Sequence, residues 1–472
     1  MDVVALLDSI DSFVWGPAMI ALLLGTHLFM TVRTGVVQRK LGCGIKLSVT
    51  KDPEAEGDIS QFQALATALS ATIGTGNIVG VGTAILAGGP GAVLWMWLTG
   101  VFGIATKYSE TFLSVKYRVK DHRGEMLGGA MYAWKRAFTR KDGSVPVWAT
   151  VFAGAFALFA AIASFGIGSA VQSSSMAGVI IANAPDVPAW AIGAAIVVLV
   201  SLVIFGGIGQ IAKVCQVLVP FMAIAYAGGC IVIIFMNGPY VLPALQLIVT
   251  CAFTPQAAFG GAVGSGLMAA LQFGCARGLF SNESGLGSAP IVAAAATTRN
   301  PARQALVSMT GTFWDTVVIC ALTGIVLVST GVADPQMFAD GTITKGAELT
   351  SVAFAQIPVV GTPILVIGMI MFSFSTIIGW SYYGNRCVTY LFGTKAIRPY
   401  QVLYVVVAFL GVIGVGDVVW TCSDIANALM AVPNIIVVLA LSGVIARETK
   451  HYLWQGNLDE VTRDEIPVVA SK

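Results

Sequence analysis

The sequence predicts an all-α polytopic membrane protein with eleven transmembrane helices, ten of which form two five-helix repeats of inverted orientation. Two observations predict this fold class. Soluble domains are about a quarter charged, whereas 56% of these 472 residues are hydrophobic and only 11% are charged. In addition, two of the apolar segments are interrupted by polar, glycine-rich stretches at corresponding positions of the two halves.

The apolar segments are identified by length, since a helix needs about 20 apolar residues to cross the hydrocarbon core of a membrane. Eleven segments of approximately this kind lie at residues 13–32, 62–87, 90–115, 148–182, 188–206, 211–236, 262–296, 303–331, 361–385, 400–415 and 420–445. We therefore expect membrane lipid to surround the bundle. The 26 lysines and arginines form no basic stripe, which argues against nucleic acid as a partner.

Lysine and arginine occur in alternate connections between the segments. The cationic connections hold Arg33 to Lys51, Lys116 to Lys141, Lys213, Arg299 and Arg303, Arg386 to Arg398, and Arg447 with Lys450, whereas the intervening loops hold only Lys345. Because cytoplasmic loops are enriched in these residues, we expect the N-terminus outside and the C-terminus in the cytoplasm, in the plasma (cytoplasmic or inner) membrane. Acidic residues precede the first segment, so it is expected to be a retained span rather than a cleaved signal.

The first interruption lies in the second apolar segment, where "ATIGTGNIVGVGTAI" spans residues 71–85. The second lies in the seventh, where "LQFGCARGLFSNESGLGSAP" spans residues 271–290. In lipid each unpaired backbone group costs several kcal/mol, so a break is tolerated only where it is buried in protein or lines a cavity. Close packing of small residues is the alternative explanation for glycines in such helices. The recurrence of polar breaks at symmetric positions favours a binding site.

The two interrupted segments are five apart, so they cross the membrane in opposite directions. This spacing predicts an inverted-repeat transporter whose discontinuous helices form a binding site near the middle of the membrane. We expect a single membrane domain over residues 1–472. Its parts are an extra N-terminal helix at 10–35, a first repeat at 60–237, a second repeat at 262–447 and a cytoplasmic tail at 448–472.

The breaks also indicate the chemistry of the ligand. Freed amides at the start of the second half-helix, around residues 76–78, would present positive charge to a carboxylate. Carbonyls of Thr72, Ile73 and Thr75, and those around Phe273 and Gly274, could accept from an ammonium group. A zwitterion of amino-acid size satisfies both ends. Its walls are expected from Phe165, Ser169, Phe273, Phe374, Ile377 and Trp380, although each of these is, taken alone, more often ordinary packing.

A cation site is indicated in the ninth segment, where "FSFSTIIGW" places Ser373, Ser375 and Thr376 inside an apolar helix. These hydroxyls could bond back to their own helix. Alternatively they supply oxygen ligands to a dehydrated cation, together with carbonyls of the first break. Sodium is favoured over a proton, because no carboxylate in the matching position offers a titratable carrier.

Charged residues inside apolar segments are expensive and suggest function. Those to weigh are Glu283, Asp315, Asp424 and the pair Lys107 and Glu110. Lys107 and Glu110 are three residues apart and are expected to pair with each other on one helix face. Glu283 could join the polar network of the second break, pair with Arg277, or act as a gate.

Several long motifs resemble the alanine/glycine:cation symporter family, also called the sodium:alanine symporters. They are "GGPGAVLWMWLTGVFG" at 88–103, "GDISQFQALATALSATIGTGNIVGVGTAI" at 57–85, "GLFSNESGLGSAPIVAAAA" at 278–296 and "GWSYYGNRC" at 379–387. The resemblance extends from about residue 13 to residue 447. It implies a leucine-transporter-type fold of the amino acid, polyamine and organocation superfamily. It also implies sodium-coupled uptake of alanine or glycine.

The same resemblance implies site residues. It places substrate contacts at Thr75, Gly76 and Asn77, further contacts near Gln272, Phe273 and Gly274, and a sodium site involving Thr72, Ser375 and Thr376. Alternatives are a proton-coupled carrier, a carrier of larger neutral amino acids, or an ion channel. An intramembrane serine protease would need a serine and histidine dyad, and no segment from the second onwards contains histidine.

Overall fold

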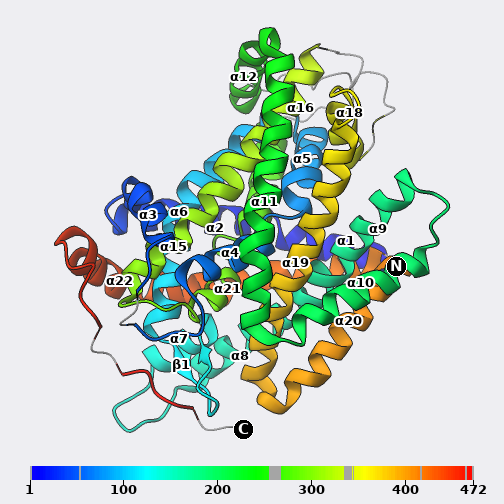
Figure 1. Ribbon diagram of the computed structural model, residues 1–472. Coiled ribbons are helices and arrows are strands. Elements are labelled where there is room, and N and C mark those ends of the chain that lie inside the picture. Colours follow the sequence, from blue (N-terminus) through cyan, green and yellow to red (C-terminus); the bar gives the residue numbers. More distant parts are fainter. Residues whose placement is uncertain are drawn as a thin grey trace.

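The computed structural model describes residues 3–52, 55–254, 267–333, 343, 345–414, 417–462 and 465–469. These residues are mostly helical, as Figure 1 shows, and their only sheet is a two-stranded antiparallel hairpin of Val119–Lys120 (β1) and Met126–Leu127 (β2). The prediction of an all-α polytopic fold is therefore confirmed at this level. The seventh predicted segment begins within residues 255–266, which lie outside the described residues.

Each predicted apolar segment coincides with a helix or with helices that continue one another. In the first half these are α1 (Val3–Val14) with α2 (Pro17–Arg33), α4 (Gln61–Thr72) with η2 (Gly76–Gly80) and α5 (Val81–Gly88), α6 (Ala92–Lys116), α8 (Val147–Phe165) with η3 (Gly166–Ala170) and α9 (Val171–Asn183), α10 (Ala189–Ile204) and α11 (Gly207–Met236). In the second half they are α13 (Leu267–Asn282) with α14 (Ala289–Ala293), α15 (Pro301–Thr312) with η5 (Phe313–Cys320) and α16 (Ala321–Ala333), α19 (Gly361–Phe392), α20 (Ile397–Ile413) and α21 (Asp417–Ala440).

Among the described residues, seven helices are long and apolar enough to cross a membrane, and the bent pair at 61–72 and 76–88 makes an eighth. The three remaining predicted spans fall outside this criterion for different reasons. Helix α6 carries Lys107 and Glu110, α10 has 16 residues, and α13 is separated from α14 by a break. The count of eleven spans stays a prediction.

Shorter elements lie at the two ends of the bundle. Helices α12 (Gly238–Phe253) and α18 (Gly346–Ala355), to which the sequence analysis assigns no element, lie near α16 at the top of Figure 1. At the opposite end lie the β1–β2 hairpin and α7 (Ala130–Ala137). The remaining short elements are η1 (Val37–Lys40), α3 (Leu41–Ser48), η6 (Thr394–Ala396), α22 (Ser442–Thr449) and η7 (Lys450–Trp454).

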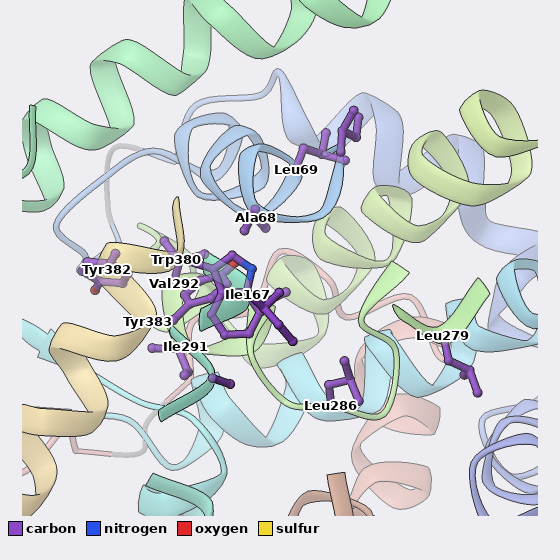
Figure 2. Packing of buried hydrophobic residues seen from close by; sticks show 14 of the residues in the cluster. Ala68, Leu69, Ile167, Leu279, Leu286, Ile291, Val292, Trp380, Tyr382 and Tyr383 are labelled. Atoms are coloured by element: carbon purple, nitrogen blue, oxygen red, sulfur yellow. The ribbon is translucent and has the colours of Figure 1, made fainter. Parts of the chain in front are cut away.

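Helix α19 occupies the centre of the bundle and packs against α4, α8, α9 and α11. Its approach to α4 is close because Gly379 has no side chain: a Cβ there would lie 2.6 Å from the Ser70 Oγ atom. Figure 2 shows Trp380 and Tyr383 of α19 beside Ile167 in the middle of the buried cluster, with Ala68 of α4 on one side and Ile291 of α14 on the other. This packing places the polar part of α19 directly against the first break.

Candidate functional site

The first break separates α4 from α5. Helix α4 ends at Thr72, Ile73 adopts an extended conformation, and the chain resumes as a helix bent by 52° from α4. Glycine is the weakest helix former after proline, and Asn77 stabilises the break because its Oδ1 accepts the Gly74 N–H at 2.9 Å. The first amides of a helix have no intrahelical acceptor and carry partial positive charge. Thr75 and Gly76, which begin this second helix, both line the cavity between the breaks.

The second break separates α13 from α14. Helix α13 ends at Asn282, and three of the next residues have positive φ angles: 54° at Glu283, 96° at Gly285 and 82° at Gly287. Glycine adopts this left-handed conformation without steric cost, whereas the Cβ atom of a glutamate makes it unfavourable. A Cβ at Gly287 would also lie 2.6 Å from the Asn434 side chain. Both predicted interruptions are thus present as breaks in buried backbone.

The two breaks lie against each other. A Cβ built on Gly76 would lie 3.5 Å from the Cα atom of Ser281, which is ordinary van der Waals contact. Asp315 of η5 also joins them, since its Oδ1 accepts from the Asn77 Nδ2 at 2.7 Å and its Oδ2 from the Ser281 Oγ at 3.0 Å. Asp315 is fully buried. This carboxylate therefore connects both interrupted helices to a third helix.

A small enclosed cavity of about 20 Å³ lies between the breaks. By volume it accommodates about one water molecule. The first break contributes Ala71, Thr72, Gly74, Thr75 and Gly76, the second contributes Phe280, Ser281 and Glu283, and the other helices contribute Ile167, Gln172, Thr376, Trp380 and Asn427. Polar groups of both breaks thus meet an apolar wall formed mainly by Trp380, Ile167 and Phe280.

Five of the residues that the sequence analysis proposed for binding line this cavity: Thr72, Thr75, Gly76, Thr376 and Trp380. Two others lie directly behind its surface. The Asn77 side chain is used within the protein, between Gly74 and Asp315. The Ser375 Oγ donates to the Phe372 carbonyl at 2.9 Å and to the Ser70 carbonyl at 3.3 Å.

The other proposed site residues lie away from the cavity. The ring of Phe165 packs 5.1 Å from that of Tyr400, and the Ser169 Oγ donates to the Tyr404 carbonyl at 3.1 Å. Phe374 and Ile377, proposed as walls, also do not line it.

Gln272, Phe273 and Gly274 lie about ten residues before the second break, which is about 15 Å along a helix. Phe273 is 37% exposed, and Gly274 packs on Ala92 and Trp95 of α6.

Two amide side chains at the cavity were not singled out from the sequence. The Oε1 atom of Gln172 and the Oδ1 atom of Asn427 are buried and have no hydrogen-bond partner among the described residues. Such atoms are rare in folded proteins. The Gln172 Nε2 donates to the Ile167 carbonyl at 3.2 Å, which fixes the amide. A Cβ on Gly74 would lie 3.7 Å from the Gln172 Oε1 and 2.6 Å from the Thr376 Oγ1, so these oxygens flank Gly74.

Buried polar and charged side chains outside the cavity bind the backbone of the second break. The expectation that Lys107 pairs with Glu110 is wrong, because no ion pair joins them within the described parts of the chain. The Lys107 Nζ instead donates to the Glu283 carbonyl at 2.9 Å. The side chain of Asn434 donates both to Glu110 and to the Gly285 carbonyl. The backbone carbonyls released by the break thus receive donors from α6 and α21.

Comparison with known proteins places the chain among membrane transporters. The sequence model of the sodium:alanine symporter family matches residues 1–465. The sodium/alanine symporter AgcS of Methanococcus maripaludis is 48% identical over 455 residues, which cover 96% of this chain and 98% of that protein. An uncharacterized transporter of Haemophilus influenzae is 46% identical, covering 99% of this chain and 100% of the other. The probable sodium/glutamine symporter GlnT of Bacillus subtilis is 32% identical, covering 94% and 90% respectively.

Proposed function

Because the chain belongs to the sodium:alanine symporter family, we propose that it imports alanine or glycine together with sodium by alternating access. Family membership makes it a multi-pass membrane transporter and not an enzyme. The observation that carries the proposal is the meeting of two broken helices at one enclosed cavity. Discontinuous helices of this kind form the ion and substrate sites of inverted-repeat transporters.

The substrate would bind with its carboxylate at the freed amides of Thr75 and Gly76. A helix N-terminus presents donors and a favourable dipole to an anion there. Trp380, Ile167 and Phe280 limit the space on the apolar side, which favours a methyl group or a hydrogen atom as the substrate side chain. Because the closed cavity is smaller than alanine, binding requires it to widen.

The sodium ion would bind between α4 and α19. Thr376 and Ser375 both direct hydroxyls to the Ser70 carbonyl, at 3.1 and 3.3 Å. The unpartnered Gln172 oxygen also lies near Gly74, 3.7 Å from the position of a Cβ built there, and Thr72 lines the same cavity. Hydroxyl, amide and main-chain oxygens are hard ligands of the kind that bind such cations in broken-helix transporters. The set supports a cation site at Thr72, Ser375 and Thr376, extended by Gln172.

The leucine-transporter-type fold, with repeats at 60–237 and 262–447 and an extra helix at 10–35, is part of the same proposal. The packing of the helices supports a two-fold relation between the repeats. Helix α8 packs on α21, and α11 packs on α19; the proposed axis exchanges these two contacts. The contacts of α6 with α15 and of α10 with α20 each join helices that occupy equivalent positions in the two repeats.

The cationic connections support an orientation with the C-terminal tail in the cytoplasm. Figure 1 shows α7 and β1 at the lower left and α3 and α22 at the left, all of which come from these connections, whereas α12 and α18 lie at the top. The membrane potential would then assist uptake. One charge moving through 100 mV supplies about 2.3 kcal/mol, or roughly a fifty-fold concentration ratio.

Release into the cytoplasm would require an opening at the far end of α19. A second cavity of about 210 Å³ lies there, between α19, α20 and the α10–α11 connection. The buried Arg386 pairs with Glu125 of the β1–β2 hairpin at 2.8 Å on its rim. This ion pair would have to separate or move when the bundle rocks.

Uptake into proteoliposomes tests the proposed function. We expect labelled alanine to accumulate when sodium is present outside, and we expect uptake to fall to background when choline replaces sodium at fixed pH. Undiminished uptake in choline would favour the alternative of proton coupling. Competition by unlabelled glycine and glutamine tests the alternative of a broader neutral amino acid carrier. Glutamine is included because one relative, GlnT of Bacillus subtilis, is a probable sodium/glutamine symporter.

Thr376→Ala is expected to raise the sodium concentration for half-maximal uptake about tenfold, because a hydrogen-bonding oxygen at a charged ligand contributes roughly 1.5–3 kcal/mol. The alanine requirement at saturating sodium should change much less. Thr376→Ser keeps the hydroxyl and serves as the control. An unchanged sodium dependence in the alanine variant would remove Thr376 from the cation site.

Trp380→Leu is expected to admit larger neutral amino acids, because this side chain forms most of the apolar wall. Inhibition of labelled alanine uptake by leucine and glutamine measures the effect, and we expect inhibition only in the variant. Trp95→Leu is the matched control, since Trp95 packs on Phe253 away from the cavity. If both variants exclude leucine as the native protein does, the wall lies elsewhere.

A further inference from the structure

Glu283 is the one ionisable side chain that lines the cavity between the breaks, within the residues that the structure describes. Only 3% of its surface is exposed. It does not pair with Arg277, and in the described parts of the chain no cation lies within ion-pair distance of its carboxylate. The nearby Lys107 binds the main-chain carbonyl of Glu283. A carboxylate buried in this way costs several kcal/mol unless a positive group reaches it.

The backbone holds Glu283 in a fixed and unfavourable conformation. Its φ of 54° is in the left-handed region, which costs a residue with a side chain roughly 1–2 kcal/mol. Lys107 holds the Glu283 carbonyl from one side, and the Ser288 Oγ donates to the carboxylate Oε2 at 2.5 Å. Glycine would fit the same turn without strain. The position therefore carries a glutamate in spite of its backbone, which points to a use for the carboxylate.

The charges around the cavity are complementary to an α-amino acid. One wall offers the amides of Thr75 and Gly76 at the start of a helix, and the adjoining break offers the Glu283 carboxylate. The two breaks are in contact at Gly76 and Ser281, and both groups line the same cavity. An ammonium group has three donors to place. Asn427, whose oxygen is buried without a partner at the same cavity, supplies a second acceptor.

We propose that the Glu283 carboxylate receives the ammonium group of the substrate and thereby selects amino acids over the corresponding hydroxy acids. This inference rests on the proposed function, whose cation site lies around Gly74 and Thr376. Glu283 belongs to the second break, where it determines which substrates bind. Lactate, which has a hydroxyl where alanine has its ammonium group, brings no positive charge into the cavity beside the one that Lys107 supplies from behind the break, and is therefore rejected.

Equilibrium binding to the purified full-length protein tests this assignment. In saturating sodium the native protein is expected to bind alanine and to ignore lactate. Glu283→Gln should bind alanine about a hundredfold more weakly, since it loses a buried charge pair worth roughly 3 kcal/mol. Its preference for alanine over lactate should fall to within about tenfold, which is 1.4 kcal/mol. Binding of radioactive sodium without amino acid should be similar in both proteins.

Asp424→Asn is the control, because Asp424 is a buried acid that does not line the cavity and accepts a hydrogen bond from the Trp15 side chain. It should keep the preference for alanine. Glu283→Asp retains the charge and should also keep the preference, with weaker binding. If Glu283→Gln does not fold, judged by size-exclusion chromatography, a loss of the preference in Glu283→Asp overturns the proposal.

Two outcomes would contradict the assignment. Full selectivity for alanine in Glu283→Gln would show that the ammonium group binds elsewhere. A loss of sodium binding in Glu283→Gln, without amino acid present, would make Glu283 part of the cation site. Failure of the proposed function is a separate result, since it would be seen as sodium-independent alanine uptake by the native protein.

Discussion

Asp315→Ala is expected to reduce sodium-driven alanine uptake about a hundredfold. The change removes the carboxylate that accepts from the Asn77 amide and the Ser281 hydroxyl, and it leaves them only the longer contacts with the residue 315 main-chain carbonyl and the Cys320 sulfur. The loss of a buried acceptor costs roughly 1–3 kcal/mol for each group, so the two together cost about 2–6 kcal/mol, a range that includes the 2.8 kcal/mol or so of a hundredfold effect. Because Asp315 joins both breaks to a third helix, the two interrupted helices should no longer move together when it is lost.

Asp424→Asn provides the comparison for this prediction. Asp424 is a second buried acid in an apolar helix, and it accepts a hydrogen bond from the Trp15 side chain at 3.2 Å, away from the cavity. Uptake by this variant should stay within a few-fold of the native rate. Proteoliposomes with matched protein content supply both measurements. Native uptake by Asp315→Ala would mean that the two breaks are held without this carboxylate.

Gly74→Ala is expected to weaken sodium binding about tenfold or more and to lower alanine uptake with it. The added Cβ would lie 2.6 Å from the Thr376 Oγ1, closer than carbon and oxygen can approach without movement. The hydroxyl would have to turn away from the Ser70 carbonyl, to which it now donates. The loss of one oxygen ligand to a cation is worth about 1.5–3 kcal/mol. Binding of radioactive sodium to the purified protein measures the change.

Gly80→Ala is the control for Gly74→Ala, because a Cβ at Gly80 meets nothing within 4 Å. Both changes replace a glycine of the same interrupted segment with alanine. Only the change at Gly74 reaches the oxygens that flank the proposed ion. Equal effects at the two positions would attribute the result to the helix backbone and not to the cation site.

The breaks could be predicted from the sequence because their signal is local. Glycine and polar residues inside an apolar segment disfavour a continuous helix whatever packs around them. The same reasoning identified Thr75 and Gly76, which belong to the break itself, and Trp380 and Thr376, which lie in an apolar segment with a cluster of hydroxyls. All four line the cavity.

The remaining cavity residues depend on tertiary packing. Gln172 and Asn427 line the cavity because of the face that each of their long helices turns toward the breaks. A single polar residue in an apolar helix does not reveal which face that is. Phe273 belongs to the interrupted segment, yet the break occurs about ten residues later, which corresponds to nearly three helical turns. The sequence identifies an interrupted helix more accurately than the position at which the helix ends.

Lys107 illustrates a competition that sequence spacing does not describe. A lysine and a glutamate three residues apart are neighbours on a helix surface, which favours a pair. In the structure the lysine binds the Glu283 carbonyl instead. Carbonyls at a helix end lack intrahelical donors and carry partial negative charge, and inside an apolar bundle no water can satisfy them. The break in α13 therefore provides a partner that is absent from the α6 sequence.

The central claim is that sodium and the amino acid occupy one cavity formed by both breaks, and reciprocal binding tests it most directly. Labelled alanine binding is measured over a series of sodium concentrations, and radioactive sodium binding over a series of alanine concentrations, with the purified native protein. Linkage requires each ligand to raise the affinity of the other by the same factor, and we predict a factor of about ten or more in both directions. Alanine affinity that is identical in sodium and in choline would contradict the account.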